Sequence, residues 1–141
     1  MNYDPKNVIC TVAGIPVSGF ADGTFITIER NEDSFALRVG VTGEACRAKN
    51  NNRSGRMTFT LMQSAQCNSL LSGLNVLDEQ SPMGDGIGPF TLTDLNGDSL
   101  AGAEKCWIVK PAALTYSKEA ESREWVFETA DLSLTVGGDP L

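Results

Sequence analysis

The chain has 141 residues, of which 41% are hydrophobic and 21% are charged, and its formal net charge at pH 7 is −7. This length and composition predict a single globular domain, residues 1–141, and exclude a disordered chain. The negative charge excludes a general electrostatic attraction to nucleic acid or to anionic membrane surfaces.

The chain has four cysteines and no histidine. Without histidine, catalytic sites of the Ser-His-Asp and Cys-His types are excluded. The cysteines are widely separated and form no Cys-x-x-Cys pair, so we expect no metal site and free, mostly buried thiols at Cys10, Cys46, Cys67 and Cys106. The N-terminal residues contain no basic segment followed by an apolar run, and we therefore expect no signal peptide.

The first twenty residues predict a flexible N-terminal arm and two short strands. The arm is expected over residues 1–6, and Val8–Ala13 is rich in residues that favour strands. Val17–Phe20 is expected to return as the second strand. Because Pro16 cannot donate a backbone hydrogen bond, this hairpin is expected at a sheet edge or at a turn.

Residues 24–62 predict alternating strands. In residues 24–30, Ile26 and Ile28 lie on one face of a strand. Residues 56–62 form a later strand, so residues 33–62 predict a long hairpin. In its first strand, alternation predicts a half-buried face made of Phe35, Leu37, Val39 and Val41.

The middle of this hairpin is polar and basic. Residues 45–56 hold four basic side chains and no acid, whereas residues 78–104 hold six acids and no base. The run of asparagines predicts a loop over residues 45–55, because asparagine supports turns and adds nothing to a core. The candidate contact residues in and beside this loop are Arg47, Lys49, Asn50, Asn51, Asn52, Arg53 and Arg56.

Three interpretations of these residues remain open. A solvated loop tip is the simplest. A nucleic-acid patch is less favoured, because no aromatic side chain lies among the basic residues to stack on bases. Among functional interpretations a protein contact is favoured, since a basic loop and an acidic body can fix the register between partners.

One helix is predicted over about residues 65–78, with Ser64 as its N-cap. The charge-free run of residues 57–77, which overlaps it, contains too many Ser, Thr, Asn and Gln side chains for a membrane span. At helical spacing, one stripe is expected to face the sheet: Cys67, Leu70, Leu71, Leu74 and Leu77.

The last third of the chain predicts more strands. Phe90–Leu95 and Ala103–Lys110 flank Asn96-Gly97, a strong hairpin turn signal. Arg123–Thr135 alternates on both sides of a predicted bend at residues 130–131. A loose C-terminal tail is expected over residues 135–141. Together these elements predict a mainly β fold, an antiparallel β-sandwich or partly closed barrel with one flanking α-helix.

No segment carries a catalytic motif. Asp94, Asp98 and Glu104 are close in sequence, but nothing holds them across a cleft as a glycosidase requires, and they are more simply turn residues. Residues 94–98 imitate the start of a calcium loop but lack its final acid. The glycines of residues 84–88 lack the lysine of a phosphate-binding loop. We therefore expect no enzyme activity, no metal and no cofactor.

The order of elements resembles a known family. The most specific segment is the strand-to-helix passage RMTFTLMQSAQCNSLL, and further matches are Gly43-Glu44, Arg47, Glu124-Trp125 and Gly137-Gly138. With these residues the chain resembles tail tube proteins of contractile-tailed bacteriophages, including a small group known only as phage structural proteins. The resemblance covers most of the chain.

The resemblance implies a virion structural protein of the tail, assembled in the host cytoplasm, with a fold similar to that of the type VI secretion tube protein. Six copies would close a ring, and rings would stack head to tail into a tube. Double-stranded DNA would pass through its channel without specific binding. Ring contacts would come from residues 45–55 and from the terminal arms Met1–Lys6 and Leu134–Leu141.

The resemblance also implies partners, namely the tail sheath, the baseplate and a tail terminator, and no membrane. Three alternatives remain: a tail terminator or completion protein of the same fold, a small-ligand-binding β-barrel, and a hydrolase that uses carboxylates.

Overall fold

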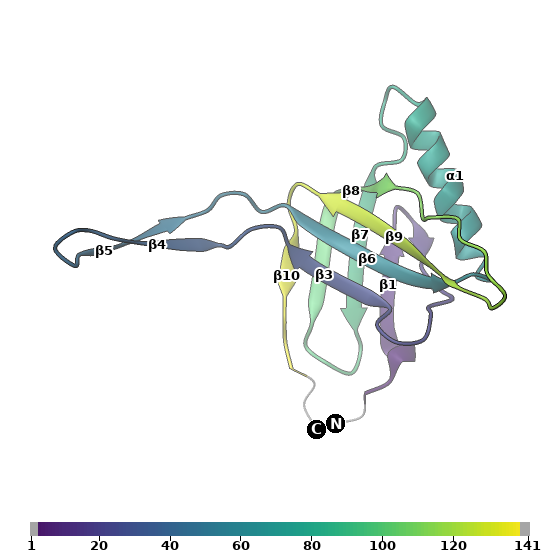
Figure 1. Cartoon of the computed structure of the whole chain (residues 1–141), viewed down its shortest axis with the longest axis horizontal. Coiled ribbons are helices and arrows are strands. Elements are labelled where there is room, and N and C mark those ends of the chain that lie inside the picture. The colour runs from purple at the N-terminus through teal and green to yellow at the C-terminus, as the bar shows by residue number, and fades with distance from the viewer. Residues whose placement is uncertain (1–2, 139–141) are drawn as a thin grey trace.

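In the computed structural model, which describes residues 3–138, the chain forms a mainly β body with one α-helix and a long projection (Figure 1). The strands are β1 Val8–Val12, β2 Ile15–Pro16, β3 Ile26–Arg30, β4 Phe35–Val39, β5 Ala45–Lys49, β6 Gly55–Met62, β7 Gly88–Asp94, β8 Leu100–Lys110, β9 Ser122–Thr129 and β10 Ser133–Thr135. The helix is α1 Cys67–Gln80, and a 3-10 turn, Pro5–Asn7, precedes β1.

Across the described residues the main sheet has eight strands in the order β2-β1-β7-β8-β9-β6-β3, with β10 attached to β8, and every pairing is antiparallel. One edge of β8 pairs with β7, while its other edge pairs with β10 near Leu100 and with β9 near Lys110. The sheet folds over at β8 and is not closed into a barrel. The predicted antiparallel sandwich with one helix is confirmed.

The core lies between the two layers of the folded sheet. Phe59 of β6 packs against Phe90 of β7 and Phe127 of β9, with ring centroids 6.0 and 5.5 Å apart. All three rings are fully buried, as are Met57 and Leu61 on the same face of β6. Alternation predicts these positions because every second residue of a strand faces the same side.

Helix α1 lies beside the sheet, and its attachment differs from the prediction. Ser64 is not the N-cap; Gln66 occupies that position without a side-chain capping bond. The Asn68 side chain fixes the helix instead, since Nδ2 donates to the Met62 carbonyl at 2.8 Å and Oδ1 accepts from Trp125 Nε1 at 2.9 Å. The buried stripe is narrower than predicted: Cys67, Leu71 and Asn75 are buried, whereas Leu70 and Leu77 are exposed.

Other expectations have mixed outcomes. The second strand is Ile15–Pro16, not Val17–Phe20, and Pro16 lies at the sheet edge as expected. The turn between β7 and β8 contains Asn96, and a bend separates β9 from β10, both as predicted. In the predicted N-terminal arm, Pro5–Asn7 forms a 3-10 turn, while residues 1–2 lie outside the described residues.

The predicted C-terminal tail begins as structured chain. Thr135 is the last residue of β10, and Gly137 N donates to Ser99 Oγ at 3.1 Å. Asp98 N donates to the Gly138 carbonyl at 3.1 Å, so these residues are bonded to the β7–β8 turn. Residues 139–141 lie outside the described residues.

The four cysteines are free thiols, and all lie in the described part of the chain. Cys10, Cys67 and Cys106 are buried and Cys46 is exposed. Burial raises the pKa of the Cys10 thiol to about 12, with Cys106 and Cys67 as further causes, and burial raises the pKa of Cys106 to about 11. The Cys10 and Cys106 thiols therefore stay protonated near neutral pH. Within residues 3–138 no helix has the length and apolar character needed to cross a bilayer.

Gly55 offers a test of the packing at the start of β6. It is buried and paired on both sides, and a Cβ there would clash with the Leu132 side chain and lie 3.1 Å from the Glu29 carbonyl. We expect Gly55→Ala to lower the free energy of unfolding by about 1–3 kcal/mol through overpacking. Gly73→Ala is the matched control. Gly73 lies on the exposed side of α1 with open space around it, so its change to alanine should raise the free energy of unfolding by about 0.5–1 kcal/mol. Urea unfolding measures both, and equal effects would contradict the expected packing.

Candidate interaction site, a projecting two-stranded arm

Strands β4 and β5 form a separate two-stranded sheet that projects from the body (Figure 1). We call residues 35–49 the projecting arm. Its register runs from Phe35 opposite Lys49 to Val39 opposite Ala45, and all ten strand residues are exposed. At the tip, Gly40 N donates to the Glu44 carbonyl at 2.7 Å. Gly43 has φ 88°, a conformation that favours glycine.

One face of the projecting arm carries a row of apolar side chains. Phe35, Leu37, Val39 and Val41 are 46%, 70%, 62% and 109% exposed. The alternation that predicts this row is present, but the predicted half-burial is wrong, because the second layer that would cover the row does not extend beneath the projecting arm. Arg47 lies across the ribbon from Leu37, and its guanidinium sits 4.1 Å from the centroid of the Phe35 ring.

The predicted loop over residues 45–55 is also corrected. Residues 45–49 form β5, and the hairpin turns at residues 40–44 instead. The segment Ala45–Lys49 lacks apolar alternation, yet it forms a strand because its backbone hydrogen-bonds to β4. Apolar alternation is not required, since neither β4 nor β5 has a buried face. The signal for the true turn was the pair Gly40 and Gly43, since the second of these has the positive φ that a tight turn uses.

The three asparagines lie at the root of the projecting arm rather than at its tip. Asn50 Nδ2 donates to the Asp33 carbonyl at 3.0 Å and to Glu32 Oε2 at 3.2 Å. Asn52 Nδ2 donates to the same Glu32 oxygen at 2.6 Å, and Asn51 is exposed between them. These bonds join the two sides of the root, so Asn50 and Asn52 fix where the projecting arm leaves the body.

The predicted basic residues divide between the body and the projecting arm. Arg53 Nε lies 2.9 Å from Asp131, and Arg56 lies 2.7 Å from Glu128 across the β6–β9 pairing. Such exposed pairs add little stability, but they place these two arginines on the body.

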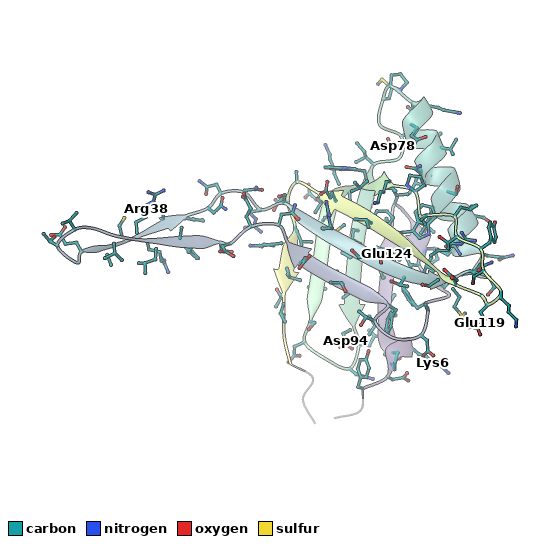
Figure 2. The ribbon with its side chains drawn as sticks, viewed as in Figure 1. Lys6, Arg38, Asp78, Asp94, Glu119 and Glu124 are labelled. Carbon is teal, nitrogen blue, oxygen red and sulfur yellow. The ribbon has the colours of Figure 1, made fainter. Side chains whose placement is uncertain are left out.

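Arg47 and Lys49 are on the projecting arm. Arg38, which is not among the predicted contact residues, also lies there (Figure 2). With Glu44, the projecting arm has net charge 3 − 1 = +2 on a chain of net −7.

This arrangement is suited to binding another protein surface. A two-stranded ribbon alone is marginally stable in water. Within residues 3–138 the outer edges of β4 and β5 pair with no other strand, and such edges beside an exposed apolar row favour pairing with another chain. The arrangement offers no comparable support for catalysis. Asp94, one of the carboxylates considered for a hydrolase, has a local structural role, because its Oδ1 accepts from Asn96 N within the β7–β8 turn. No group of three or more metal-ligating side chains is found among residues 3–138.

The fold and the projecting arm define the class: a β-sandwich protein with an exposed two-stranded arm outside its main sheet. The model of the Bacteriophage PhiTE tail tube protein family matches residues 8–137, so the chain belongs to that family. It is 26% identical over 143 residues to Structural protein ORF10 of Pseudomonas phage KPP10, covering 97% of this chain and 83% of that protein.

Two solved structures share the fold at low sequence identity. One is the tube-terminating cap of the anti-feeding prophage, with TM-score 0.58 and 7% identity, covering 96% of this chain and 93% of that one. The other is the PVC sheath/tube terminator of an extracellular contractile injection system in the extended state, with TM-score 0.59 and 8% identity, covering 96% and 98%.

These findings confirm the predicted resemblance at the level of a phage tail tube-like protein. The chain is a structural protein of the phage tail, and its place is the virion. Membership of a structural family indicates a non-enzymatic role. The part played by the projecting arm and by residues 50–56 in ring stacking stays a prediction.

The exposure of the projecting arm leads to a proteolysis prediction. In the free subunit, trypsin should cut after Arg38 or Arg47 before it cuts after Arg56, because the ribbon opens locally without breaking the core. Arg56 is a matched control: its side chain is 48% exposed, but its strand is paired on both sides. Mass spectrometry of the first fragments gives the order. Earlier cutting after Arg56 would show that the projecting arm is more firmly held than its contacts indicate.

Proposed function

We propose that this chain is the inner tail tube subunit, which forms rings of six copies that stack head to tail into a tube for passage of the phage genome. The observation that carries the proposal is the projecting arm, whose ten strand residues are all exposed. The family and the related phage structural protein support it. The number six comes from the resemblance to tail tube proteins.

The direction of the projecting arm supports contact between different surfaces of neighbouring copies. A five-residue strand spans roughly 17 Å, so the tip stands well clear of its own body (Figure 1). Such an element meets a surface unlike itself on the next copy, which is a heterologous contact. Heterologous contacts generate rings or open tubes, depending on whether the rotation closes.

The outer face of β3, β6 and β9 suits the wall of a DNA channel. Thr27 pairs with Thr58, and Thr60 pairs with Glu124, whose place on this face is visible in Figure 2. The single arginine of this part of the face, Arg56, is paired with Glu128. At −7 per copy, six copies carry 6 × 7 = 42 net negative charges. Repulsion from such a wall would keep DNA from adhering to it.

The proposal includes the other tail components. The exposed side of α1, with Leu70, Val76 and Leu77, is available for the tail sheath, and the two ends of the tube would meet the baseplate and a tail terminator. Assembly in the host cytoplasm belongs to the same proposal.

A tail terminator of the same fold is the second candidate. The observation that favours it is that both similar solved structures are terminators of tubes in contractile injection systems. The family of the matching model favours the tube subunit.

The first prediction from this function concerns the projecting arm. Asn50 N donates to the Ser34 carbonyl at 2.8 Å, so a two-residue Asn-Gly turn can replace residues 35–49. We expect the shortened protein to fold with a free energy of unfolding within about 1 kcal/mol of the parent, because the projecting arm adds nothing to the core. Negative-stain electron microscopy should show rings or tubes for the parent and none for the shortened protein.

The control for this experiment is Leu70→Ser with Leu77→Ser, which removes two exposed leucines from α1 instead. This variant should assemble like the parent. Normal rings or tubes from the shortened protein would show that the projecting arm is not the assembly element.

A second prediction separates a tube subunit from a terminator. Purified tube subunits should form tubes of variable length that grow with protein concentration, because each added ring exposes the same binding surface again. A terminator should stop at single rings under the same conditions. Electron microscopy across a concentration series measures the length distribution, and a uniform population of single rings would favour the terminator.

A further inference from the structure

The body has an open seam where its folded sheet fails to close. Within residues 3–138, β3 pairs only with β6 and β10 pairs only with β8, so each has one unpaired edge. Between them lies a cavity of about 460 Å³ with a largely apolar lining. We call this cavity and its two strand edges the open seam.

The apolar side chains of the open seam are incompletely covered. Ile26 and Ile28 of β3 and Leu134 of β10 pack against the core but are only half-buried. Leu100 at the start of β8 also lines the cavity and is 54% exposed. A further strand with apolar side chains on one face would complete this side of the sandwich.

We propose that the projecting arm of one copy occupies the open seam of a second copy, an inference that rests on the proposed assembly of copies into rings. The chain contains both halves of such a contact. Phe35, Leu37 and Val39 repeat every second residue, and so do Ile26 and Ile28. Neighbouring strands of one sheet share this spacing. A strand of the projecting arm would therefore pair with the unpaired edge of β3 and place the apolar row of the projecting arm in the cavity.

The projecting arm does not meet its own open seam. It extends away from the body from its root beyond β3 (Figure 1). Arg38 stands far out on the projecting arm, while Asp94, which lines the cavity, lies on the body (Figure 2). The occupant is therefore the projecting arm of another copy.

Charge complementarity supports the same pairing. The projecting arm has net charge +2 from Arg38, Arg47, Lys49 and Glu44. Asp94 lines the open seam, and Asp22 and Asp98 are chain neighbours of the lining residues Gly23 and Ser99. The nearby bases in sequence are Lys6, between the lining residues Tyr3 and Val8, and Arg30, two residues after the lining residue Ile28. The Arg30 guanidinium already donates to the Leu132 carbonyl at 2.9 Å. Opposite charges of this kind orient the partners on approach.

Cysteine cross-linking tests the contact. Cys46, the exposed native thiol, is first changed to serine, while the buried Cys10 and Cys106 stay unreactive at neutral pH because burial raises the pKa of each. Two copies with different tags are then expressed together, one with Leu37→Cys on the projecting arm and one with Leu100→Cys in the open seam. The control pairs Leu37→Cys with Leu77→Cys on α1, a leucine 50% exposed against 54% for Leu100.

Under mild oxidation we expect a cross-linked dimer of the two tagged copies when Leu37→Cys is combined with Leu100→Cys. We expect no such dimer when Leu37→Cys is combined with Leu77→Cys. Electron microscopy of the same samples reports assembly independently. Rings or tubes without the Leu37–Leu100 cross-link, or with the Leu37–Leu77 cross-link instead, would overturn the docking and leave the proposed function standing. The cross-link without rings or tubes would support the docking and overturn the ring function. Neither cross-link nor assembly would overturn both.

Discussion

The pairing of Arg30 with Gly55 at the root of the projecting arm is the constraint on which the molecule's shape depends. It is the last pair of the β3–β6 ladder, and Asn31 N continues it by donating to the Ser54 carbonyl at 3.1 Å. Leu132 locks the same point from the other layer: its carbonyl accepts from the Arg30 guanidinium at 2.9 Å, and its N donates to the Arg53 carbonyl at 2.9 Å. The root is thus bonded to both layers of the body, whereas all ten strand residues of the ribbon beyond it are exposed.

A bonded root with an exposed ribbon determines how association can be stabilised. Complete burial of one Val, Leu or Phe side chain contributes roughly 1.5–3 kcal/mol. In the free chain, Phe35, Leu37 and Val39 are 46% to 70% exposed. Docking can therefore bury only part of each side chain, and it contributes only part of this free energy. Association also costs translational and rotational freedom. One arm contact therefore gives a modest affinity, and a stable assembly follows when many copies make the same contact at once.

The sequence predicts those parts of the fold in which alternation and burial coincide. In β6, Met57, Phe59 and Leu61 are apolar and buried at every second position, and Trp125 and Phe127 repeat this spacing in β9. The Asn96-Gly97 signal marks a real turn. The helix was also predictable, although its cap was not, because Asn68 takes its partners from β6 and β9 rather than from the helix itself. Alternation alone could not show whether the Phe35 row is covered, since coverage depends on a second layer that lies elsewhere in the chain.

The same limit explains why the sequence predicts a single loop for the basic residues. Arg47 and Arg53 are six residues apart in sequence but lie in different parts of the structure. Arg47 is on the projecting arm, whereas Arg53 follows the end of β5, where the chain returns to the sandwich. Arg53 is then neutralised by Asp131, a partner 78 residues away, whereas Arg47 stacks on Phe35 within the ribbon. Of the four predicted basic residues, Arg53 and Arg56 are thus paired with acids on the body, and the projecting arm presents Arg47 and Lys49.

That separation of charge favours association of the chain with itself. A net +2 projecting arm on a chain of net −7 leaves −7 − 2 = −9 on the remainder, so an arm is attracted to the body of any neighbouring copy while two bodies repel. The attraction acts between unlike surfaces, which is the requirement for a contact that repeats head to tail. Screening shortens its reach to about 10 Å at 0.1 M salt, so charge orients the approach and the apolar row must hold the contact.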